Sequence, residues 1–434
     1  MENVKEVKKF DMARKPVRQR WFLTPVAWLL AMPEVFQRKL KITKIGMESV
    51  KPPYLFISNH MAFVDFKSAT RAIFPHRANY VVAIDGFLRG EWLLRQVGCL
   101  CKRKFTDDIV LIRNMRHSLE VNKTILALYP EARYSYVGTQ SVLPSSLGKL
   151  IKVFKVPVVT YIQRGNYLSQ PVWNLEKRKV RIEATMKRLF TPEEIEKASV
   201  EEINAALEET FRYDDYRWQK ENGIRIDYKD RAKGLHHVLY QCPSCGAESR
   251  MASGGDKLWC EACGKTWRMT ELGEMEALSG PTEFSHIPDW FEWERAQVRK
   301  QVEEGSYFFM DRVVVDSLPN AKGYIRLGEA TLTHSLDGFV LERQTEGEEM
   351  RLEKKPLSLY SLHIEFDYFG KGDCLDLSTL DDTFYIYPLT RKNVVTKLQF
   401  AVEEIYKIKE RERQAAAAAK AGIATARNAA QILP

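Results

Sequence analysis

The sequence predicts an α/β protein in which a large first domain is followed by a four-cysteine ribbon and a small antiparallel β domain that ends in a helix. Three observations support this fold class. Short apolar runs at 54–57, 126–128 and 156–159 are typical of buried strands. Two Cys-x-x-Cys pairs lie near the middle of the chain. From about 306 to 390, apolar and polar residues alternate between turns, as they do in antiparallel strands.

Asn59, His60 and Asp65 come directly after the first apolar run. A histidine with an aspartate five residues later can form a general base, because the carboxylate fixes the imidazole tautomer and stabilises the imidazolium. Positions five apart lie on different faces of a continuous helix, so we expect His60 before a helix and Asp65 in its first turns. No serine or cysteine is placed as an obvious nucleophile, which favours activation of a substrate hydroxyl. The same pair alone also fits a buried histidine satisfied by a neighbouring acid.

Three further motifs follow His60 and Asp65. They are a strand-like stretch from Gly98 that ends in Lys102, Arg103 and Lys104, the segment Tyr129-Pro130-Glu131 with Ser135 beyond it, and the strand start Val156-Pro157. In this order the motifs resemble those of the glycerolipid acyltransferase family, which includes the lysophosphatidate acyltransferases. The resemblance covers roughly residues 20–190.

The resemblance implies a mixed-sheet catalytic domain at 51–190 that moves a fatty acyl chain from a thioester to a hydroxyl of a lysophospholipid, with 1-acylglycerol-3-phosphate as the leading acceptor. It implies His60 as the general base, oriented by Asp65. Asn59, Arg103, Glu131 and Arg133 are the implied substrate-binding residues. A guanidinium suits phosphate oxygens, and Glu131 braces the site from its turn. Acyl-CoA or acyl carrier protein is the implied donor.

The third motif departs from the family pattern. Ala132, Arg133 and Tyr134 stand where the family has Gly, Thr and Arg, so the guanidinium lies one residue early. The departure leaves the acceptor open, and another lysolipid or an amino-acid lipid stays an alternative. For the cations at 102–104, a solvated basic strand end is the alternative interpretation.

Four cysteines have the spacing C-x2-C-x14-C-x2-C, with a glycine after each pair. They are Cys242, Cys245, Cys260 and Cys263. Two such turns can close a tetrahedral site of four thiolates, and this pattern, which resembles a zinc ribbon, favours zinc over iron or disulfides. Four protein ligands leave no open position, so the zinc is expected to be structural. Cys99, Cys101 and Cys374 show no pairing pattern, which indicates a reducing compartment.

The net charge of +9 is concentrated near the start of the chain, because residues 1–51 contain 12 Lys and Arg against 5 Asp and Glu. An apolar segment at 21–33 lies between basic flanks and is too short to span a bilayer. It can be a helix in the headgroup region or a helix packed on the catalytic domain. Its two tryptophans and the basic flanks favour the membrane interface. We therefore predict a cytoplasmic protein held peripherally on the inner face of the membrane.

Composition and motifs divide the chain into seven predicted parts. They are a basic, amphipathic membrane-associating segment at 1–50, the catalytic domain at 51–190, a helical connector at 191–233, the zinc ribbon at 234–272, a helix at 273–305, a β domain with a terminal helix at 306–410, and an Ala-rich tail at 411–434. The connector contains two capping boxes, at Thr191 and Ser199. The second of its helices should run to about Trp218. The β domain resembles a pleckstrin-homology domain in pattern.

Two function classes remain. One is a membrane-associated acyltransferase. The other is a catalytically inactive or regulatory zinc-ribbon scaffold that binds protein, lipid or nucleic acid. The ribbon has mixed charge and no basic stripe, which argues against nucleic acid, whereas a protein partner of the C-terminal half stays open. The presence of His60, Asp65, Arg103 and Glu131 together favours the enzyme.

Overall fold

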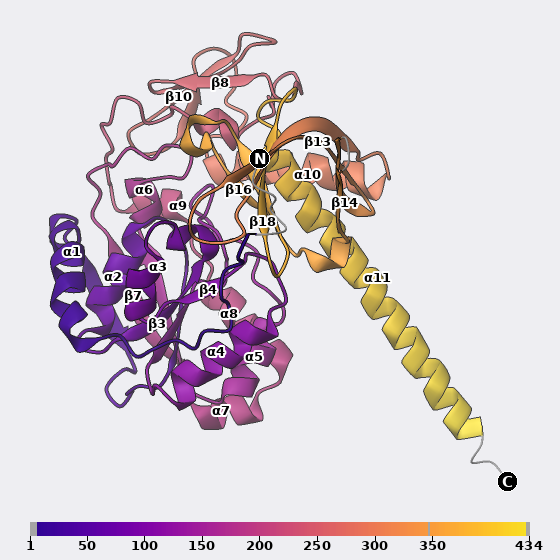
Figure 1. Cartoon of the computed structure of the whole chain (residues 1–434). Coiled ribbons are helices and arrows are strands. Elements are labelled where there is room, and N and C mark those ends of the chain that lie inside the picture. Colours follow the sequence, from indigo (N-terminus) through magenta and orange to yellow (C-terminus); the bar gives the residue numbers. More distant parts are fainter. Residues whose placement is uncertain (1–6, 346–347, 431–434) are drawn as a thin grey trace.

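The computed structural model describes residues 7–345 and 348–430, and it contains three sheets (Figure 1). The first sheet has the strand order β1-β7-β6-β2-β5-β3-β4. Its strands are β1 (Lys41–Ile45), β2 (Leu55–Ser58), β3 (Ala78–Ala83), β4 (Leu100–Lys102), β5 (Ile125–Leu128), β6 (Val158–Arg164) and β7 (Glu183–Phe190). Neighbouring strands are parallel except for β6 and β7, so the predicted mixed sheet is confirmed.

Helices cover both faces of the first sheet. They are α1 (Thr24–Gln37), α2 (Val64–Ile73), α3 (Glu91–Gln96), α4 (Ile109–Glu120), α5 (Leu147–Phe154) and α6 (Asn166–Ser169), with short 3-10 turns at Trp21–Leu23 and Ile84–Phe87. Because side chains alternate along a strand, Phe56 of β2 packs on the α2 side while Leu55 and Ile57 pack on the side of α4 and α5. A strand buried on both faces is a continuous apolar run, which is why these strands could be predicted.

The connector consists of α7 (Pro192–Lys197), α8 (Val200–Thr210) and α9 (Asp215–Glu221). Both predicted capping boxes are present, since Thr191 and Ser199 each accept from the backbone N–H three residues later. The expectation of one helix to about Trp218 was wrong. The α8 helix ends at Thr210, and Asp214 caps a new helix by accepting from the N–H of Arg217.

The ribbon is a four-stranded antiparallel sheet in the order β11-β10-β9-β8, followed by α10 (Ile287–Glu303). A 3-10 turn at Leu235–His237 precedes it. Its strands are β8 (Met251–Gly254), β9 (Lys257–Cys260), β10 (Thr266–Met269) and β11 (Met275–Ala277).

The C-terminal sheet is antiparallel, with the order β15-β14-β13-β12-β18-β17-β16. Its strands are β12 (Phe309–Ser317), β13 (Ile325–Ser335), β14 (Gly338–Thr345), β15 (Glu348–Lys354), β16 (His363–Glu365), β17 (Cys374–Ser378) and β18 (Thr383–Pro388), with 3-10 turns at Pro356–Ser358 and Tyr368–Gly370. The helix α11 (Val395–Ala430) follows, so the layout of antiparallel strands and a terminal helix is as predicted. The helix also includes most of the expected tail, and it projects from the body of the molecule (Figure 1).

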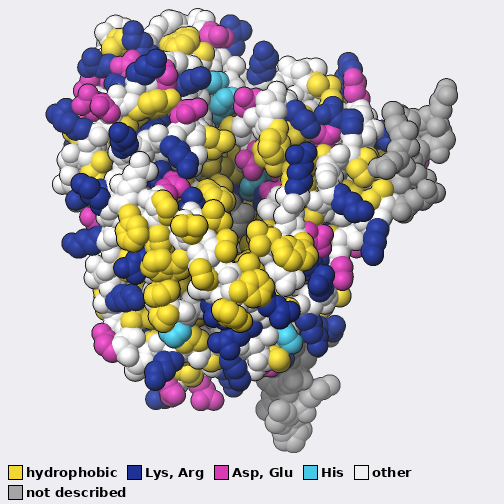
Figure 2. Space-filling view, turned by 60° about the vertical axis from the view of Figure 1, so that its left-hand side comes forward, with side chains coloured by type: hydrophobic (Ala, Val, Ile, Leu, Met, Phe, Trp, Pro, Cys, Tyr) yellow, Lys and Arg dark blue, Asp and Glu magenta, His cyan; other side chains and the backbone are white. Residues whose placement is uncertain are grey.

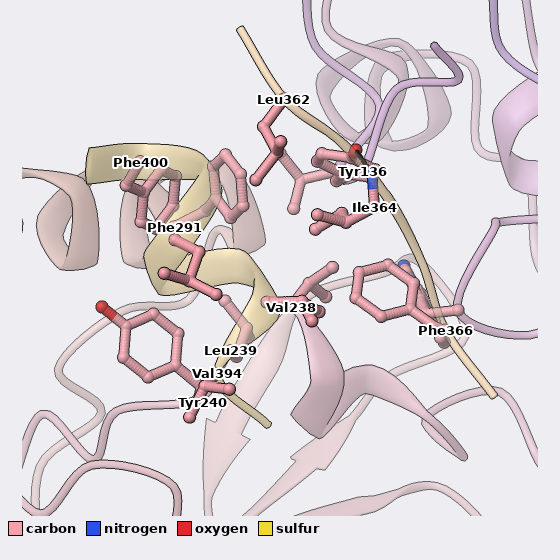
Figure 3. Close-up of a cluster of buried hydrophobic side chains, with 14 of the residues drawn as sticks. Tyr136, Val238, Leu239, Tyr240, Phe291, Leu362, Ile364, Phe366, Val394 and Phe400 are labelled. Carbon is pink, nitrogen blue, oxygen red and sulfur yellow. Dashed lines mark hydrogen bonds between the residues drawn. The ribbon is translucent and has the colours of Figure 1, made fainter. Parts of the chain in front are cut away.

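One hydrophobic core joins the successive parts of the chain (Figure 3). It contains Tyr136 from the first half, Trp267 from the ribbon, Ile364 from the C-terminal sheet and Phe400 from α11. The three sheets are therefore parts of one packed body. Within the described ranges, no helix is both long and apolar enough to cross a membrane.

Candidate active site

His60 lies where β2 gives way to α2, as the spacing predicted. The strand ends at Ser58, the helix begins at Val64, and Asp65 occupies its first turn. The Nδ1 of His60 lies 3.0 Å from Oδ2 of Asp65. The same oxygen accepts from the backbone N–H of Met61 at 2.6 Å and of Ala62 at 3.0 Å. These contacts fix the buried carboxylate, and with Nδ1–H donating to it, Nε2 of His60 is the basic nitrogen.

Two further polar groups support this pair from β6 and α6. Asn166 donates from Nδ2 to Oδ1 of Asp65 at 2.8 Å, and it also donates to Gln163 at 2.8 Å. Asn59 is fully buried and exchanges two hydrogen bonds with the backbone of Gln163, at 2.9 and 2.8 Å. Asn59 therefore joins the ends of β2 and β6 and does not line a cleft. Sequence reasoning missed Asn166 because it is 101 residues from Asp65.

Two tyrosine rings enclose the imidazole of His60. The ring of Tyr129 is stacked at 4.4 Å between centroids, and the ring of Tyr134 is tilted at 4.2 Å. Aromatic contact of this kind restricts the ring to one orientation. Both tyrosines belong to the third motif. Tyr134, which stands where the family pattern has Arg, therefore contacts the ring of His60.

Glu131 braces the backbone around His60 without touching its ring. Its Oε2 accepts from the N–H of His60 at 2.7 Å, and its Oε1 accepts from the N–H of Ser141 at 2.6 Å and from the hydroxyl of Tyr213 at 3.0 Å. Burial raises the pKa of Glu131 to about 7, although these hydrogen bonds favour the charged form. Its position agrees with the expected bracing role.

Arg103 does not reach the cleft in which His60 lies. It is buried and donates to the carbonyls of Leu318 (3.0 Å), Pro319 (3.0 Å) and Asp381 (2.9 Å) and to the hydroxyl of Thr383 (2.9 Å). The cause is an alternation that starts in β4 and continues just beyond its end at Lys102. Cys101 and Arg103 contact the C-terminal half, whereas Lys102 and Lys104 line the cleft. This position gives no support to the acceptor-binding role expected for Arg103.

Lys102 and Arg133, by contrast, are among the cations that line the cleft. Lys102 is half-buried, its pKa is lowered by burial, and its ammonium has no side-chain hydrogen bond or ion pair with any residue that the structure describes. Arg133 lies over the ring of Tyr136 at 4.1 Å and 3.4 Å from Oε1 of Glu403. Burial alone would raise the pKa of Glu403, but Arg295 and Arg133 lower it to about 2, so this carboxylate stays ionised.

The cleft has a volume of about 1430 Å³, and its walls come from both halves of the chain. His60, Tyr129 and Tyr134 lie in one wall, and Tyr360, His363, Glu365 and Tyr406 belong to the C-terminal half. Its mouth is apolar. Figure 2 shows hydrophobic side chains gathered beside and below a hollow on this face, with Lys and Arg beneath this hydrophobic patch. The cleft-lining residues among the exposed apolar ones are Val26, Leu30, Phe63, Phe66, Phe74, Leu93, Ile109, Ile112, Val153, Leu357 and Phe369.

The four ribbon cysteines form a second candidate site. Their sulfurs all lie within 4.8 Å of one another, and Cys242–Cys263 and Cys245–Cys260 are each 3.8 Å apart. A tetrahedron with Zn–S bonds of about 2.3 Å has edges of about 3.8 Å, whereas a disulfide needs about 2.05 Å. Gly246 and Gly264 have φ of +77° and +75°, which lets each Cys-x-x-Cys turn close. The four thiols can therefore bind one metal ion.

Comparisons with known proteins add little to this geometry. No family model matches the chain, and no curated protein matches it. Among solved structures, the chain is similar to the 1-acyl-sn-glycerophosphate (LPA) acyltransferase PlsC from Thermotoga maritima, with 15% sequence identity and a TM-score of 0.36. The match covers 44% of this chain and 77% of that chain. A likeness of this size carries no functional argument, so the function has to be argued from the site.

Proposed function

We propose that the chain is an O-acyltransferase that moves a fatty acyl chain from a thioester donor to a hydroxyl of a lysophospholipid. The observation that carries this proposal is the oriented His60–Asp65 pair in the wall of a large, mainly apolar cleft. Nε2 of His60 takes the hydroxyl proton, and the oxygen attacks the thioester carbonyl. The tetrahedral intermediate collapses, the C–S bond breaks, and the imidazolium returns the proton to the leaving thiolate.

Lys102 and Arg133 are the cations we propose for the acceptor phosphate, in place of Arg103. Lys102 lines the cleft and has no side-chain partner in the part of the chain that the structure describes, and a guanidinium can bind phosphate oxygens in bidentate fashion. The leading acceptor is 1-acylglycerol-3-phosphate, and the donor is acyl-CoA or acyl carrier protein.

We further propose that the apolar mouth of the cleft rests on the inner face of the membrane. On the first helix and the turn before it, Trp21, Leu29 and Leu30 are 73%, 76% and 67% exposed. Exposed Phe63, just before α2, and Ile109 of α4 continue this surface, and Lys67, Arg77 and Lys149 line the same cleft. An apolar patch beside cations suits an anionic bilayer, in which a lysolipid acceptor is dissolved.

Zinc is the metal we propose for the four cysteines. Cys242, Cys245, Cys260 and Cys263 together complete a tetrahedral shell of thiolates, which leaves no position for substrate. The ion would hold the two turns of the ribbon together and take no part in acyl transfer.

The proposal is tested with purified full-length protein, labelled acyl-CoA and acyl-carrier-protein donors, and a panel of lysolipid acceptors. Transfer to a hydroxyl by wild type, and its loss in His60→Ala with unchanged folding, is the expected result. A scaffold would transfer nothing to any acceptor. Equal activity of wild type and His60→Ala would exclude the proposed base.

A further inference from the structure

The short strand β16 presents its two faces to different surroundings. Leu362, Ile364 and Phe366 point into the shared hydrophobic core (Figure 3). His363 and Glu365 occupy the alternate positions and line the cleft. Because neighbouring side chains of a strand point to opposite faces, the core packing fixes these two residues at the cleft wall.

This wall is attached to the catalytic half at several points. The N–H of Ile364 donates to the hydroxyl of Tyr136 at 3.2 Å. Lys104 donates to Oδ2 of Asp85 at 2.9 Å and lies 3.4 Å from Oδ2 of Asp376, which in turn lies 2.9 Å from Nδ1 of His363. The mixed-charge group of Lys104, Asp85, His363, Asp376 and Glu365 is therefore built from both halves of the chain.

Glu365 has unused capacity to accept hydrogen bonds. Asp85 and Asp376 both pair with Lys104, whereas among the described residues the ion-pair contact of Glu365 is with Nε2 of His363, at 3.5 Å. Its side chain is 28% exposed. Burial, more than any neighbouring charge, raises the pKa of Glu365. Three carboxyl groups thus lie around Lys104 and the imidazole of His363. Of the three, Glu365 has the longest printed contact and a partly exposed side chain, so its carboxylate can accept a cation that enters the cleft.

The mixed-charge group lies near the proposed base. Tyr134, whose ring touches that of His60, lines the same cleft as His363 and Glu365. A phosphate placed here would meet three carboxyl groups, so the anionic part of an acceptor belongs instead with Lys102 and Arg133.

We propose that Glu365 is a specificity-determining residue that binds an ammonium group on the acceptor. The inference rests on the proposed acyl transfer, and within that activity it ranks hydroxyl acceptors with an ammonium above 1-acylglycerol-3-phosphate, which has none. The ammonium can belong to the headgroup of a lysophospholipid or to an amino-acid lipid, because both offer the same charge and N–H donors.

The experiment measures equilibrium binding of short-chain, water-soluble acceptors to wild-type protein without an acyl donor. The three acceptors are 1-acylglycerol-3-phosphate (phosphate only), its ethanolamine ester (phosphate and ammonium) and a hydroxyl-bearing amino-acid lipid (ammonium only). The variants are Glu365→Gln, which removes the charge, and Glu365→Asp, which shortens its reach. Asp337→Asn removes an exposed carboxylate from the turn between β13 and β14, outside the cleft, and serves as the matched control.

We expect wild type to bind the ethanolamine ester more tightly than the phosphate-only acceptor. Glu365→Gln should weaken each ammonium-bearing acceptor that binds by about tenfold and leave the phosphate-only acceptor within about twofold. Glu365→Asp should weaken the same acceptors less, and Asp337→Asn should change none. Tighter binding of the ethanolamine ester by wild type would identify a phospholipid headgroup as the source of the ammonium. Tighter binding of the amino-acid lipid would identify an amino-acid lipid.

An equal loss for all acceptors in Glu365→Gln and Glu365→Asp, or no preference for ammonium in wild type, would overturn this inference. Turnover of the same acceptors is measured separately. If the protein turns over the acceptors but shows no Glu365-dependent preference for binding an ammonium, the ammonium site is wrong and the acyl transfer is not. If it shows that preference but no turnover, the acyl transfer is wrong and the ammonium site is supported.

Discussion

The imidazole of His60 is held on three sides, by the carboxylate of Asp65 and by the rings of Tyr129 and Tyr134. Asp65 both orients the ring and stabilises the imidazolium formed when a proton is taken. Substitution Asp65→Asn should therefore lower kcat by about 10²-fold or more with little change in KM, and His60→Ala should lower it further. Initial rates of labelled acyl transfer check this. A wild-type rate in either folded variant would contradict the role.

The raised pKa of Glu131 predicts how the free energy of unfolding depends on pH. The folded chain holds the Glu131 proton up to a pKa of about 7, and an unfolded glutamic acid releases it near 4.5. Between these pH values the folded state binds more protons, so this residue makes the free energy of unfolding fall as pH rises through the window. The fall should amount to about 3 kcal/mol at most. Urea unfolding of wild type from pH 4.5 to 8, compared with Glu131→Gln, should show a shallower dependence in the variant.

The site residues that could be predicted are those that lie close to one another along the sequence. His60 and Asp65 are five residues apart, and each cysteine pair spans one turn, so spacing alone specified their contact. Asn166 could not be predicted, because it reaches Asp65 only through the folding of β6. Glu365 comes from the other half of the chain, and nothing in the sequence linked it to His60.

At the scale of elements, the end of β4 gives neighbouring cations two different roles: Lys102 lines the cleft, and Arg103, just after the strand, binds the C-terminal half. Arg103→Met would leave the carbonyls of Leu318, Pro319 and Asp381 buried without their donor. It should lower the free energy of unfolding by about 3 kcal/mol or more. Lys102→Gln should leave stability unchanged and raise KM for a phosphate acceptor about tenfold. Urea unfolding and initial rates separate the two effects. The reverse pattern would mean that Arg103 holds the acceptor.

The exposed face of α1 and of the turn before it carries the prediction about membrane contact. Trp28 is half-buried against Phe74 at 4.5 Å and is best left intact. Replacing Trp21, Leu29 and Leu30 with glutamine should weaken binding to anionic vesicles by at least about tenfold, because each apolar side chain contributes about 1.5–3 kcal/mol on burial. Turnover of a soluble short-chain acceptor should persist. Vesicle sedimentation measures the binding.

A matched control replaces Leu278, Leu380 and Leu389, which are also exposed but do not line the cleft. This variant should bind vesicles as wild type does. If both triple variants lose binding equally, the effect is general hydrophobicity and the cleft face is not a membrane surface.

For the molecule as a whole, the four cysteines should hold one zinc per chain. Cys242 and Cys260 belong to the same hydrophobic core as Tyr136 and Phe400, so a ribbon without metal would loosen the body around it. Zinc binding to such sites contributes on the order of 10 kcal/mol to folding, and it weakens as pH falls because thiolates are the ligands. We expect chelation to lower Tm and acyl transfer together.

Metal analysis and calorimetry check the zinc prediction. Cys242→Ser should lose the metal and lower Tm, whereas Cys374→Ala, at a buried cysteine outside the ribbon, should keep one zinc per chain. A chain without metal would contradict zinc. A Tm and an activity that survive chelation would show that the ribbon is independent of the rest.

The sequence predicted the succession of a mixed sheet, a cysteine ribbon and antiparallel strands with a helix, because each has its own period or spacing. It could not predict that His363 and Glu365 of β16 complete the cleft of the first sheet. Side-chain alternation shows which residues share a face of a strand, but the partner of that face is chosen by packing between distant segments. For this reason the packing of the C-terminal sheet against the first sheet could not be predicted from the sequence.

The four hydrogen bonds of Arg103 can form only late in the synthesis of the chain. Their acceptors lie between 215 and 280 residues further along the chain, so the ribosome exposes Arg103 long before it makes them. Until then the first sheet carries a cation on the surface that the C-terminal sheet will later cover. Contacts of such long range form slowly, and segments that wait for them are prone to aggregation. The protein should therefore become active only after its last strands have been synthesised, and a nascent chain stalled before them should depend on chaperones.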